Sequence, residues 1–219
     1  MKNLLFLMVK VALICGCATN SSEQLSTETD TVAIAKVQEE NYDVEKDSVV
    51  FSSATIENFD RDGNSIDVFW LDESRDTVLK FYRTYDDDGN LIGARYYEAG
   101  DDEPSRDTVY VNSDGLKVEA SLNGDRQIKW KSTTQPDDRG NPVLKTYENG
   151  KGEYRGLDSL FFDDKDRVVK GFYKNSKGKR MSVKTYQYTQ SDEYGNWIER
   201  EMYKDDTLRQ RQVRVLSYY

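Results

Sequence analysis

The stretch TYDDDGNLIGARYY, from Thr84 to Tyr97, holds the pattern on which the whole chain is built. Its centre, Asp86 to Asn90, has the residues of a tight turn, because an Asp side chain accepts hydrogen bonds from the backbone just after it and Gly89 can take a positive φ. Aromatic and aliphatic residues, which favour strands, stand on both sides. The stretch therefore predicts two antiparallel strands joined by a turn, that is, a β-hairpin.

Versions of this turn recur along the chain at a nearly constant interval. Successive turns are 26, 26 and 25 residues apart, and a gap of 55 residues follows. A further turn at residues 163–167 lies inside that gap and has Asp166 where the others have Gly. A fixed period is typical of a repeat architecture. The positions that carry the period are Gly63, Gly89, Gly115, Gly140, Asp166 and Gly195.

The segments between these turns alternate in polarity with a period of two. Apolar and polar residues alternate from Leu116 to Asn123, for example, which indicates a strand with one solvated face. Second turns, such as Asn123-Gly124-Asp125, lie midway between the first ones. One period is therefore one hairpin, and six periods predict about twelve antiparallel strands in sequential order.

The composition bears on the shape of this sheet. Apolar residues make up 37% of the chain and charged residues 32%, against roughly 45–50% and 25% in ordinary globular domains. A thick core is not expected. We therefore predict that residues 49–219 form an all-β domain, an antiparallel meander of about six hairpin repeats in an extended twisted sheet, or one curled on itself, rather than a filled barrel.

The first residues predict export and a lipid anchor. Lys2 precedes an apolar run of signal-peptide length that is too short to span a bilayer. The sequence Ile14-Cys15-Gly16-Cys17 resembles the lipobox of bacterial lipoproteins. The resemblance implies removal of residues 1–16, a diacylglycerol thioether on Cys17 and acylation of the new N-terminus, for example with palmitate. Because Ala18 and not Asp follows, it also implies the outer membrane. The alternative is a plain secretory signal cut elsewhere.

Residues 17–48 predict a flexible tether between this anchor and the domain. The segment is rich in Ser, Thr and Glu, and such a composition buries too little apolar surface to offset the entropy of ordering. Within it, residues 31–40 predict a short helix, because Val32, Ile34, Ala35 and Val37 fall near one helical face.

The residues that are missing exclude several classes of function. The chain has no His, and its two cysteines, Cys15 and Cys17, lie in the first 17 residues. The body therefore has no imidazole base or ligand and no thiol, and we expect no cofactor, no metal and no enzymatic activity. The net charge is −9, and −11 without residues 1–16, which argues against a nucleic-acid partner.

The hairpin motif resembles the YD repeats of the RHS family. The best match is Tyr85-Asp86-x-x-Gly89-Asn90-Leu91 with Tyr96, and weaker matches start at Asp60, Asp137 and Asp192. The resemblance covers about residues 50–219 and implies a style of fold only, since six hairpins are too few for the shells that RHS proteins build around toxins. Residues 148–152, ENGKG, are also similar to MORN-type hairpin repeats.

Three kinds of side chain are candidate sites, each with an ordinary structural role as the alternative. The Asp-rich turns offer oxygen ligands for Ca²⁺, but they lack the EF-hand spacing and Asp is a common turn residue. Carboxylate pairs could serve a hydrolase, but nothing singles one out among 40 acids. The basic residues of 165–184 alternate with other types, as on a solvated strand face.

Aromatic residues stand in most of the predicted strands. They could bind a glycan or a protein partner on an exposed sheet, or they could pair across strands and stabilise it. They are Trp70, Tyr82, Tyr96, Tyr97, Trp130, Tyr147, Phe172, Tyr186, Tyr188, Trp197 and Tyr203.

Together these features predict a non-enzymatic binding or scaffolding module of the cell envelope. Its membrane contact is the lipidated Cys17, and its partner is an envelope protein or a glycan. The alternatives are a surface glycan-binding protein and a carboxylate-dependent hydrolase. Whether the domain faces the periplasm or the cell surface stays open.

Overall fold

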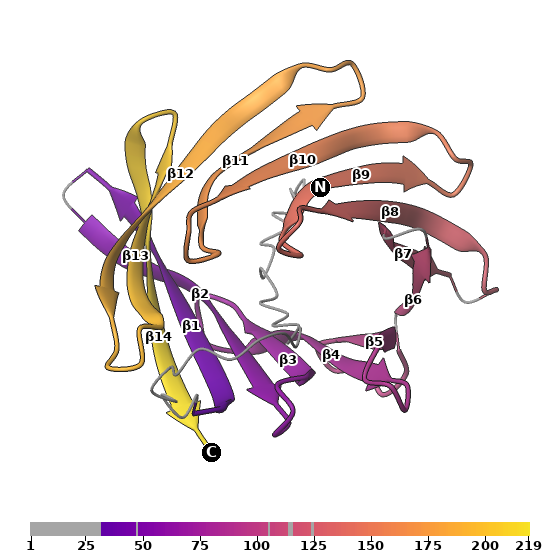
Figure 1. Ribbon diagram of the computed structural model, residues 1–219, viewed down its shortest axis with the longest axis horizontal. Helices are drawn as coiled ribbons and strands as arrows, with labels where there is room; N and C mark the ends of the chain where they lie inside the picture. The colour runs from indigo at the N-terminus through magenta and orange to yellow at the C-terminus, as the bar shows by residue number, and fades with distance from the viewer. Residues whose placement is uncertain (1–31, 47, 105, 114–115, 124) are drawn as a thin grey trace, which may run out of the picture.

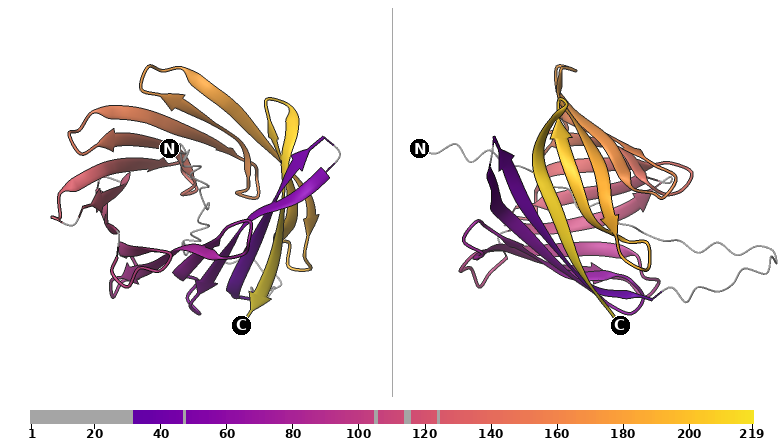
Figure 2. Two further views of the ribbon diagram at one scale, coloured as in Figure 1. Left: turned by 180° about the vertical axis from the view of Figure 1, so that it is seen from behind. Right: turned by 90° about the vertical axis from the view of Figure 1, so that its left-hand side faces the viewer.

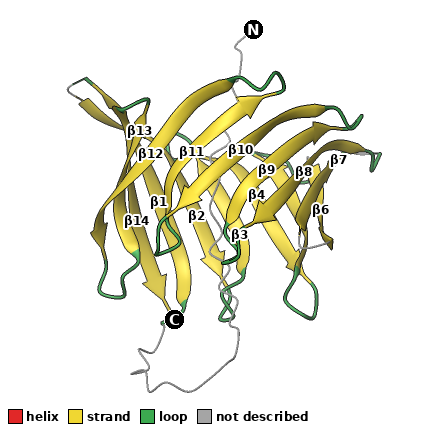
Figure 3. Ribbon diagram, turned by 45° about the horizontal axis from the view of Figure 1, so that its top comes forward, coloured by secondary structure: helices red, strands yellow, loops and turns green. Residues whose placement is uncertain are grey.

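The computed structural model describes residues 32–46, 48–104, 106–113, 116–123 and 125–219 of the chain. In this part of the chain no helix is long and apolar enough to cross a membrane. The secondary structure consists of strands and turns (Figure 3). The strands are β1 (Ile34–Glu45), β2 (Ser48–Phe59), β3 (Ser65–Leu71), β4 (Thr77–Tyr85), β5 (Leu91–Glu98), β6 (Arg106–Ser113), β7 (Leu116–Leu122), β8 (Ile128–Pro136), β9 (Pro142–Asn149), β10 (Tyr154–Phe162), β11 (Val168–Asn175), β12 (Arg180–Ser191), β13 (Trp197–Lys204) and β14 (Thr207–Tyr218).

These strands form one antiparallel meander that closes into a barrel. Each strand pairs with the next in the sequence, and β1 pairs with β14 (Figures 1 and 2). The all-β class and the sequential antiparallel order are confirmed. The extended open sheet is wrong, because β1 and β14 are paired at nine positions, with Glu39 opposite Arg214 and Asn41 opposite Gln212.

The two strands of this seam lie outside the six turns of the repeat. Five of those turns join β2 to β3, β4 to β5, β8 to β9, β10 to β11 and β12 to β13, and the predicted turn at Gly115 lies outside the described residues, between β6 and β7. The strands on either side of the six positions are the twelve that the period predicts. The additional strands are β1 and β14, and closure removes the free edges that an open sheet would expose.

The C-terminus helps to hold the seam closed. The Tyr219 amide donates to the carbonyl of Ala33 at 3.0 Å, so the ends of β1 and β14 are bonded to each other. The Tyr218 hydroxyl donates to Asp192 in the turn between β12 and β13, and the Tyr219 hydroxyl donates to the carbonyl of Phe59 at the end of β2. The last two residues thus connect three neighbouring hairpins.

Strand β1 also corrects two expectations for the N-terminal region. It occupies residues 34–45, where a short helix was predicted within a tether that was to reach residue 48. The apolar residues Ile34, Ala35 and Val37 do not form a continuous helical stripe, whereas Glu39 and Asn41 alternate with outward residues and match the partners on β14. The barrel thus begins well before residue 49. Cys17 and residues 1–16 lie outside the described residues.

The turns have the geometry that the sequence predicts. In the first motif, the amides of Asp88 and Asn90 donate to the Asp86 carboxylate at 3.1 and 2.7 Å, and Gly89 has a φ of 78°. Asp166 takes the glycine position of its turn with a φ of 56°. The same backbone hydrogen bonds recur in nine turns of the described chain, which start at Asp60, Asp72, Asp86, Asn123, Asp137, Asn149, Asp163, Asn175 and Asp192.

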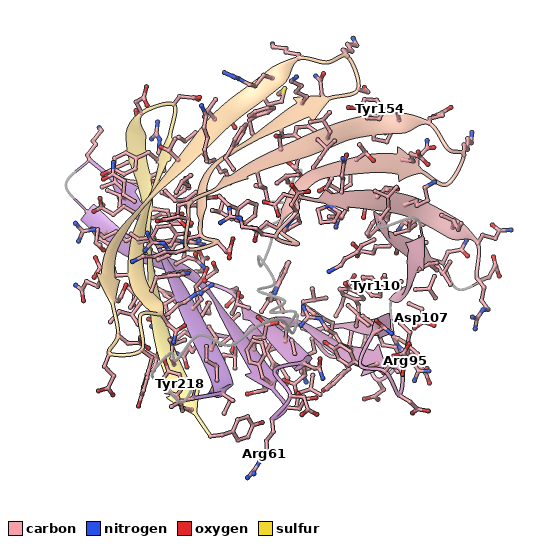
Figure 4. All side chains as sticks on the ribbon, viewed as in Figure 1. Arg61, Arg95, Asp107, Tyr110, Tyr154 and Tyr218 are labelled. Atoms are coloured by element: carbon pink, nitrogen blue, oxygen red, sulfur yellow. The ribbon has the colours of Figure 1, made fainter. Side chains whose placement is uncertain are left out.

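Alternation along the strands divides the side chains into an inner and an outer face. In Figure 4, Tyr110 points into the barrel, whereas Arg95 and Asp107 lie on the outside. The register carries this assignment around the sheet: Tyr110 is opposite Glu119, which is opposite Ser132 on β8.

The barrel has little apolar core, as the composition predicts. The buried apolar residues of the described chain are Ala54, Val68, Phe81, Ala94, Ala120, Val168 and Trp197. Large inner residues such as Trp70, Tyr110 and Trp130 are only half-buried. A closed barrel of eight strands is about the size that side chains can fill, so fourteen strands enclose a wider interior. Polar side chains occupy much of its surface, and a low apolar content is therefore compatible with closure.

Candidate functional site

The aromatic residues singled out in the sequence divide between the two faces of the barrel. Cross-strand pairing is confirmed on both: on the inside the rings of Phe81 and Tyr96 are stacked 5.1 Å apart, and on the outside Tyr82 and Tyr97 meet edge to face at 5.7 Å. The inner members are Trp70, Tyr96, Trp130, Tyr147, Tyr186, Tyr188 and Trp197, and the outer members are Tyr82, Tyr97, Phe172 and Tyr203.

The Asp-rich turns show no grouping that suits a metal ion. No cluster of three acidic, His or Cys residues able to hold a metal occurs in the described part of the chain. Their first carboxylates are engaged by backbone amides, and the amide and side chain of Asn90 lower the pKa of Asp86 in this way. These Asp residues therefore have a structural role in the turns.

The inner face from β2 to β10, here called the paired wall, carries bases and acids in direct contact. Nη1 of Arg83 lies 2.7 Å from Oε1 of Glu57, and the two side chains are only 6% and 7% exposed. The same nitrogen donates to the hydroxyl of Ser65. Charges so deeply buried are tolerated only when they are paired and hydrogen-bonded.

A second ionic contact of the paired wall lies further along the sheet. Nζ of Lys145 is 2.8 Å from Oε2 of Glu119, and the Ser132 hydroxyl donates to the same carboxylate oxygen at 3.3 Å. The Tyr147 hydroxyl donates to Asp158 at 2.5 Å. Burial, followed by the charge of Glu119, raises the pKa of Tyr147, so the phenol stays a hydrogen-bond donor at neutral pH.

Two hydroxyl groups of the paired wall are buried and lack a hydrogen-bond partner among the described residues. They belong to Thr108 on β6 and Ser121 on β7, which face each other across the strands and are 2% and 0% exposed. Trp130 on β8 is directly opposite Ser121. Buried polar groups normally have a partner, so this spot has unused hydrogen-bonding capacity beside an indole ring.

The inner face of β12, β13, β14 and β1, here called the basic wall, has a different charge pattern. Glu39 contacts two bases: Nε of Arg214 at 2.8 Å and Nη2 of Arg200 at 3.8 Å. The guanidinium carbon of Arg214 lies 3.5 Å from the ring centre of Trp197, and that of Arg200 lies 4.3 Å from it. One carboxylate and one indole thus hold two guanidinium groups.

Neutral side chains fix this cluster in place. Nε of Arg200 donates to Oε1 of Gln212 at 2.5 Å, and the Gln212 amide nitrogen donates to Asn41 at 2.6 Å. Nη1 of Arg200 donates to the Tyr188 hydroxyl at 3.3 Å. These hydrogen bonds orient the guanidinium group of Arg200 in the absence of a ligand.

Two lysines lie on the same wall towards its other end. Lys184 on β12 and Lys204 on β13 are directly opposite each other, and neither has an ion-pair or hydrogen-bond partner within the described residues. Burial, followed by the charge of Lys204, lowers the pKa of Lys184. Lys184 was predicted to lie on a solvated strand face with the other basic residues of 165–184, but it faces inward, whereas Lys170 and Lys174 of β11 lie on the outer face. Alternation of Lys184 with Tyr186 and Tyr188 was the available signal that these three side chains share one face of the strand.

Comparisons with known proteins give no family. No family model and no curated protein matches the chain. Among solved structures, a porin-like protein from Bacteroides uniformis aligns at 14% identity over 83% of this chain, with a TM-score of 0.38. The chain covers 60% of that protein's length. A DUF1329 family protein from Desulfovibrio piger aligns at 10% identity over 86% of this chain and 87% of its own, with a TM-score of 0.37. The fold described above rests on this chain's own strand pairing.

Proposed function

We propose that this protein is a non-enzymatic binding module of the cell envelope, anchored to the outer membrane through a lipid on Cys17 and binding its ligand on the inner face of the barrel. The inner face supports the binding role. Several of its charged and aromatic groups, such as Lys184, Tyr110 and Trp130, are only half-buried, and a barrel that needed only stability would gain more from apolar side chains there.

The outer face supports attachment by a lipid. Charged side chains stand near the middle of the strands on this face, including Lys80, Arg95 and Arg211, whereas the wall of a membrane-spanning barrel presents an apolar band about 25 Å tall. Two or more acyl chains on the N-terminus would hold such a domain at the membrane stably.

The inner carboxylates support binding over hydrolysis. A carboxylate-dependent hydrolase needs one carboxyl group that can donate a proton and one that can act as nucleophile or base. Glu39, Glu57 and Glu119 each contact a basic side chain, and Asp158 accepts a hydrogen bond from Tyr147. These contacts account for the four carboxylates as structural parts of the wall.

Metabolic labelling with a palmitate analogue tests the anchor. We expect label on the wild type and on a Cys15→Ser variant, but none on Cys17→Ser, and only the unlabelled variant should leave the membrane fraction. Label on Cys17→Ser would refute the anchor. Protease treatment of intact cells then separates the orientations: cleavage of the barrel indicates the cell surface, and protection until the outer membrane is opened indicates the periplasm.

A glycan is the second candidate ligand, favoured by the spot beside Trp130. Trp130 is half-buried on the inner face, so its indole ring can stack on a sugar. Titration with neutral oligosaccharides, followed by tryptophan fluorescence, tests this idea. Binding that a Trp130→Ala variant loses and a Tyr82→Ala variant of the outer face keeps would support it, and equal binding by both would refute it.

A further inference from the structure

We propose that Lys184 and Lys204 form a site for an oxyanion, the phosphate or carboxylate group of a small ligand held inside the barrel. This inference rests on the proposed function in one respect, since it takes the inner face as the binding surface. It adds the chemical class of the ligand and the place where its charge binds.

The first support is the direct opposition of two positive side chains. In an antiparallel pair, residues opposite each other have Cβ atoms about 4.5–5.5 Å apart, and like charges in that position destabilise the sheet. Lys184 and Lys204 hold such a position between β12 and β13. An oxyanion between the two ammonium groups would convert repulsion into two attractive, charge-assisted contacts.

The second support is that no carboxylate of the neighbouring strands neutralises the pair. The residue opposite Lys184 on β11 is Gly171, and the next inner pair along the strands is Tyr186 with Met202. The inner carboxylates two strands away on either side, Asp43 of β1 and Asp158 of β10, accept hydrogen bonds from Gln210 at 3.1 Å and from Tyr147 at 2.5 Å. The chain has 40 acidic and 31 basic residues, so a shortage of acids does not explain the bare lysines.

The two acidic residues of the adjacent turn are directed elsewhere. Asp205 accepts a hydrogen bond from the backbone amide of Val183 at 3.1 Å. Asp205 and Asp206 line a shallow hollow on the outer face together with Lys170 and Thr185. Their charges therefore serve the outside of the barrel. The lowered pKa of Lys184 agrees with an ammonium group that lacks a counter-charge.

The third support is a further cation on the same strand. Arg200 precedes Lys204 by four residues and lies on the same face, so about 13 Å of strand separates them. Gln212 and Tyr188 already hold its guanidinium in place. A ligand with a second oxyanion group, such as an acidic oligosaccharide or a compound with two phosphates, would reach both positions.

Calorimetric titration of the full-length protein in a neutral detergent tests the site. The probes are inorganic phosphate and trigalacturonate, with maltotriose as the neutral match and sodium chloride to equalise the ionic strength. We expect one or both anions to bind the wild type, and a Lys184→Gln/Lys204→Gln variant to bind at least tenfold more weakly. The control is Lys170→Gln/Lys174→Gln, which removes the same charge from the outer face and should bind within twofold of the wild type.

The anion that binds identifies the source of the charge. Binding of phosphate alone supports a phosphorylated ligand, and binding of trigalacturonate alone supports an acidic sugar. The proposal is overturned if neither anion binds, if the double lysine variant binds as well as the wild type, or if maltotriose binding depends on the same lysines. The phosphate and trigalacturonate results bear neither on Cys17 labelling nor on the Trp130 test, which uses neutral oligosaccharides, so failure here is separate from failure of the proposed function.

Discussion

The paired wall and the basic wall belong to one sheet, yet they differ in how their basic side chains are paired with carboxylates. On the paired wall, Arg83 and Lys145 each contact a carboxylate of their own. On the basic wall, Arg200 and Arg214 share Glu39, and Lys184 faces another lysine. The chain places many of its acids in the turns and on the outer face, which leaves one part of an acidic protein's interior positive.

This difference separates the charges that hold the barrel together from those that are available to a ligand. In a buried pair such as Glu57 and Arg83 the two charges compensate each other, and removal of either partner leaves the other charge buried and unpaired. An opposed lysine pair lacks a negative partner, and removal of one lysine relieves the repulsion between the two ammonium groups. The same kind of substitution should therefore have opposite effects on the two walls.

The largest effect is expected for Arg83→Met on the paired wall. The substitution leaves the Glu57 carboxylate buried without its partner, and we expect the free energy of unfolding to fall by about 3 kcal/mol. Urea denaturation followed by circular dichroism measures the change. The double variant Arg83→Met/Glu57→Gln should regain much of the loss, because no unpaired charge remains.

An outer-face arginine provides the matched control. Arg95 lies 3.8 Å from Asp107, and the two side chains are 68% and 44% exposed. Such pairs contribute little in water, so Arg95→Met should change the free energy of unfolding by less than about 0.5 kcal/mol. Equal losses from Arg83→Met and Arg95→Met would contradict the distinction between buried and exposed pairs.

A smaller loss is expected for Glu39→Gln on the basic wall. The neutral amide keeps the shape of the side chain but leaves Arg200 and Arg214 without a counter-charge, and we expect the barrel to lose about 2 kcal/mol of stability in urea. High salt should recover part of the loss, because mobile anions can then approach the two guanidinium groups. If salt affects this variant and the wild type equally, the arginines are not short of negative charge.

The repeat made much of this architecture predictable, and the charge pattern did not follow from it. Gly89 and Asp166 identify turns by a local rule, since the hydrogen bonds of a turn involve residues close in sequence. Closure depends instead on β1 meeting β14, and Asn41 and Gln212 are 171 residues apart. Residues 34–45 were wrongly predicted to belong to the tether for a related reason. Their composition is polar because the inner face of β1 is polar.

The inward position of Lys184 shows the same limit. Alternation with Tyr186 and Tyr188 is visible in the sequence, but which face is inside is not, because both faces of this sheet carry charged and aromatic residues. Its opposition to Lys204 depends on the register of β12 and β13, where irregularities occur further along the strands. The candidate anion site therefore became visible only in three dimensions.

For Lys184→Gln we expect the opposite effect, a gain in the free energy of unfolding. Without ligand, removal of one of two opposed ammonium groups should raise the free energy of unfolding by about 0.5 kcal/mol. Lys170→Gln, on the outer face of β11, should have no such effect. A loss of stability in Lys184→Gln would mean that the ammonium makes a favourable contact in the apo protein, and the contrast between the two walls would then fail.

The smallest effect is the pH dependence of that gain. Burial, followed by the charge of Lys204, lowers the pKa of Lys184 below its usual value of 10.5, so the folded protein gives up this proton at a lower pH than the unfolded chain does.

At neutral pH both the folded and the unfolded state carry the charge, and the charged Lys184 destabilises the folded state to its full extent. As the pH rises towards 10.5 the folded state loses the charge first, and stability increases relative to a chain without the lysine. The advantage of Lys184→Gln over the wild type should therefore shrink between pH 8 and pH 10.5 in urea denaturation. An advantage that stays constant over this range would show that folding does not lower the pKa of Lys184.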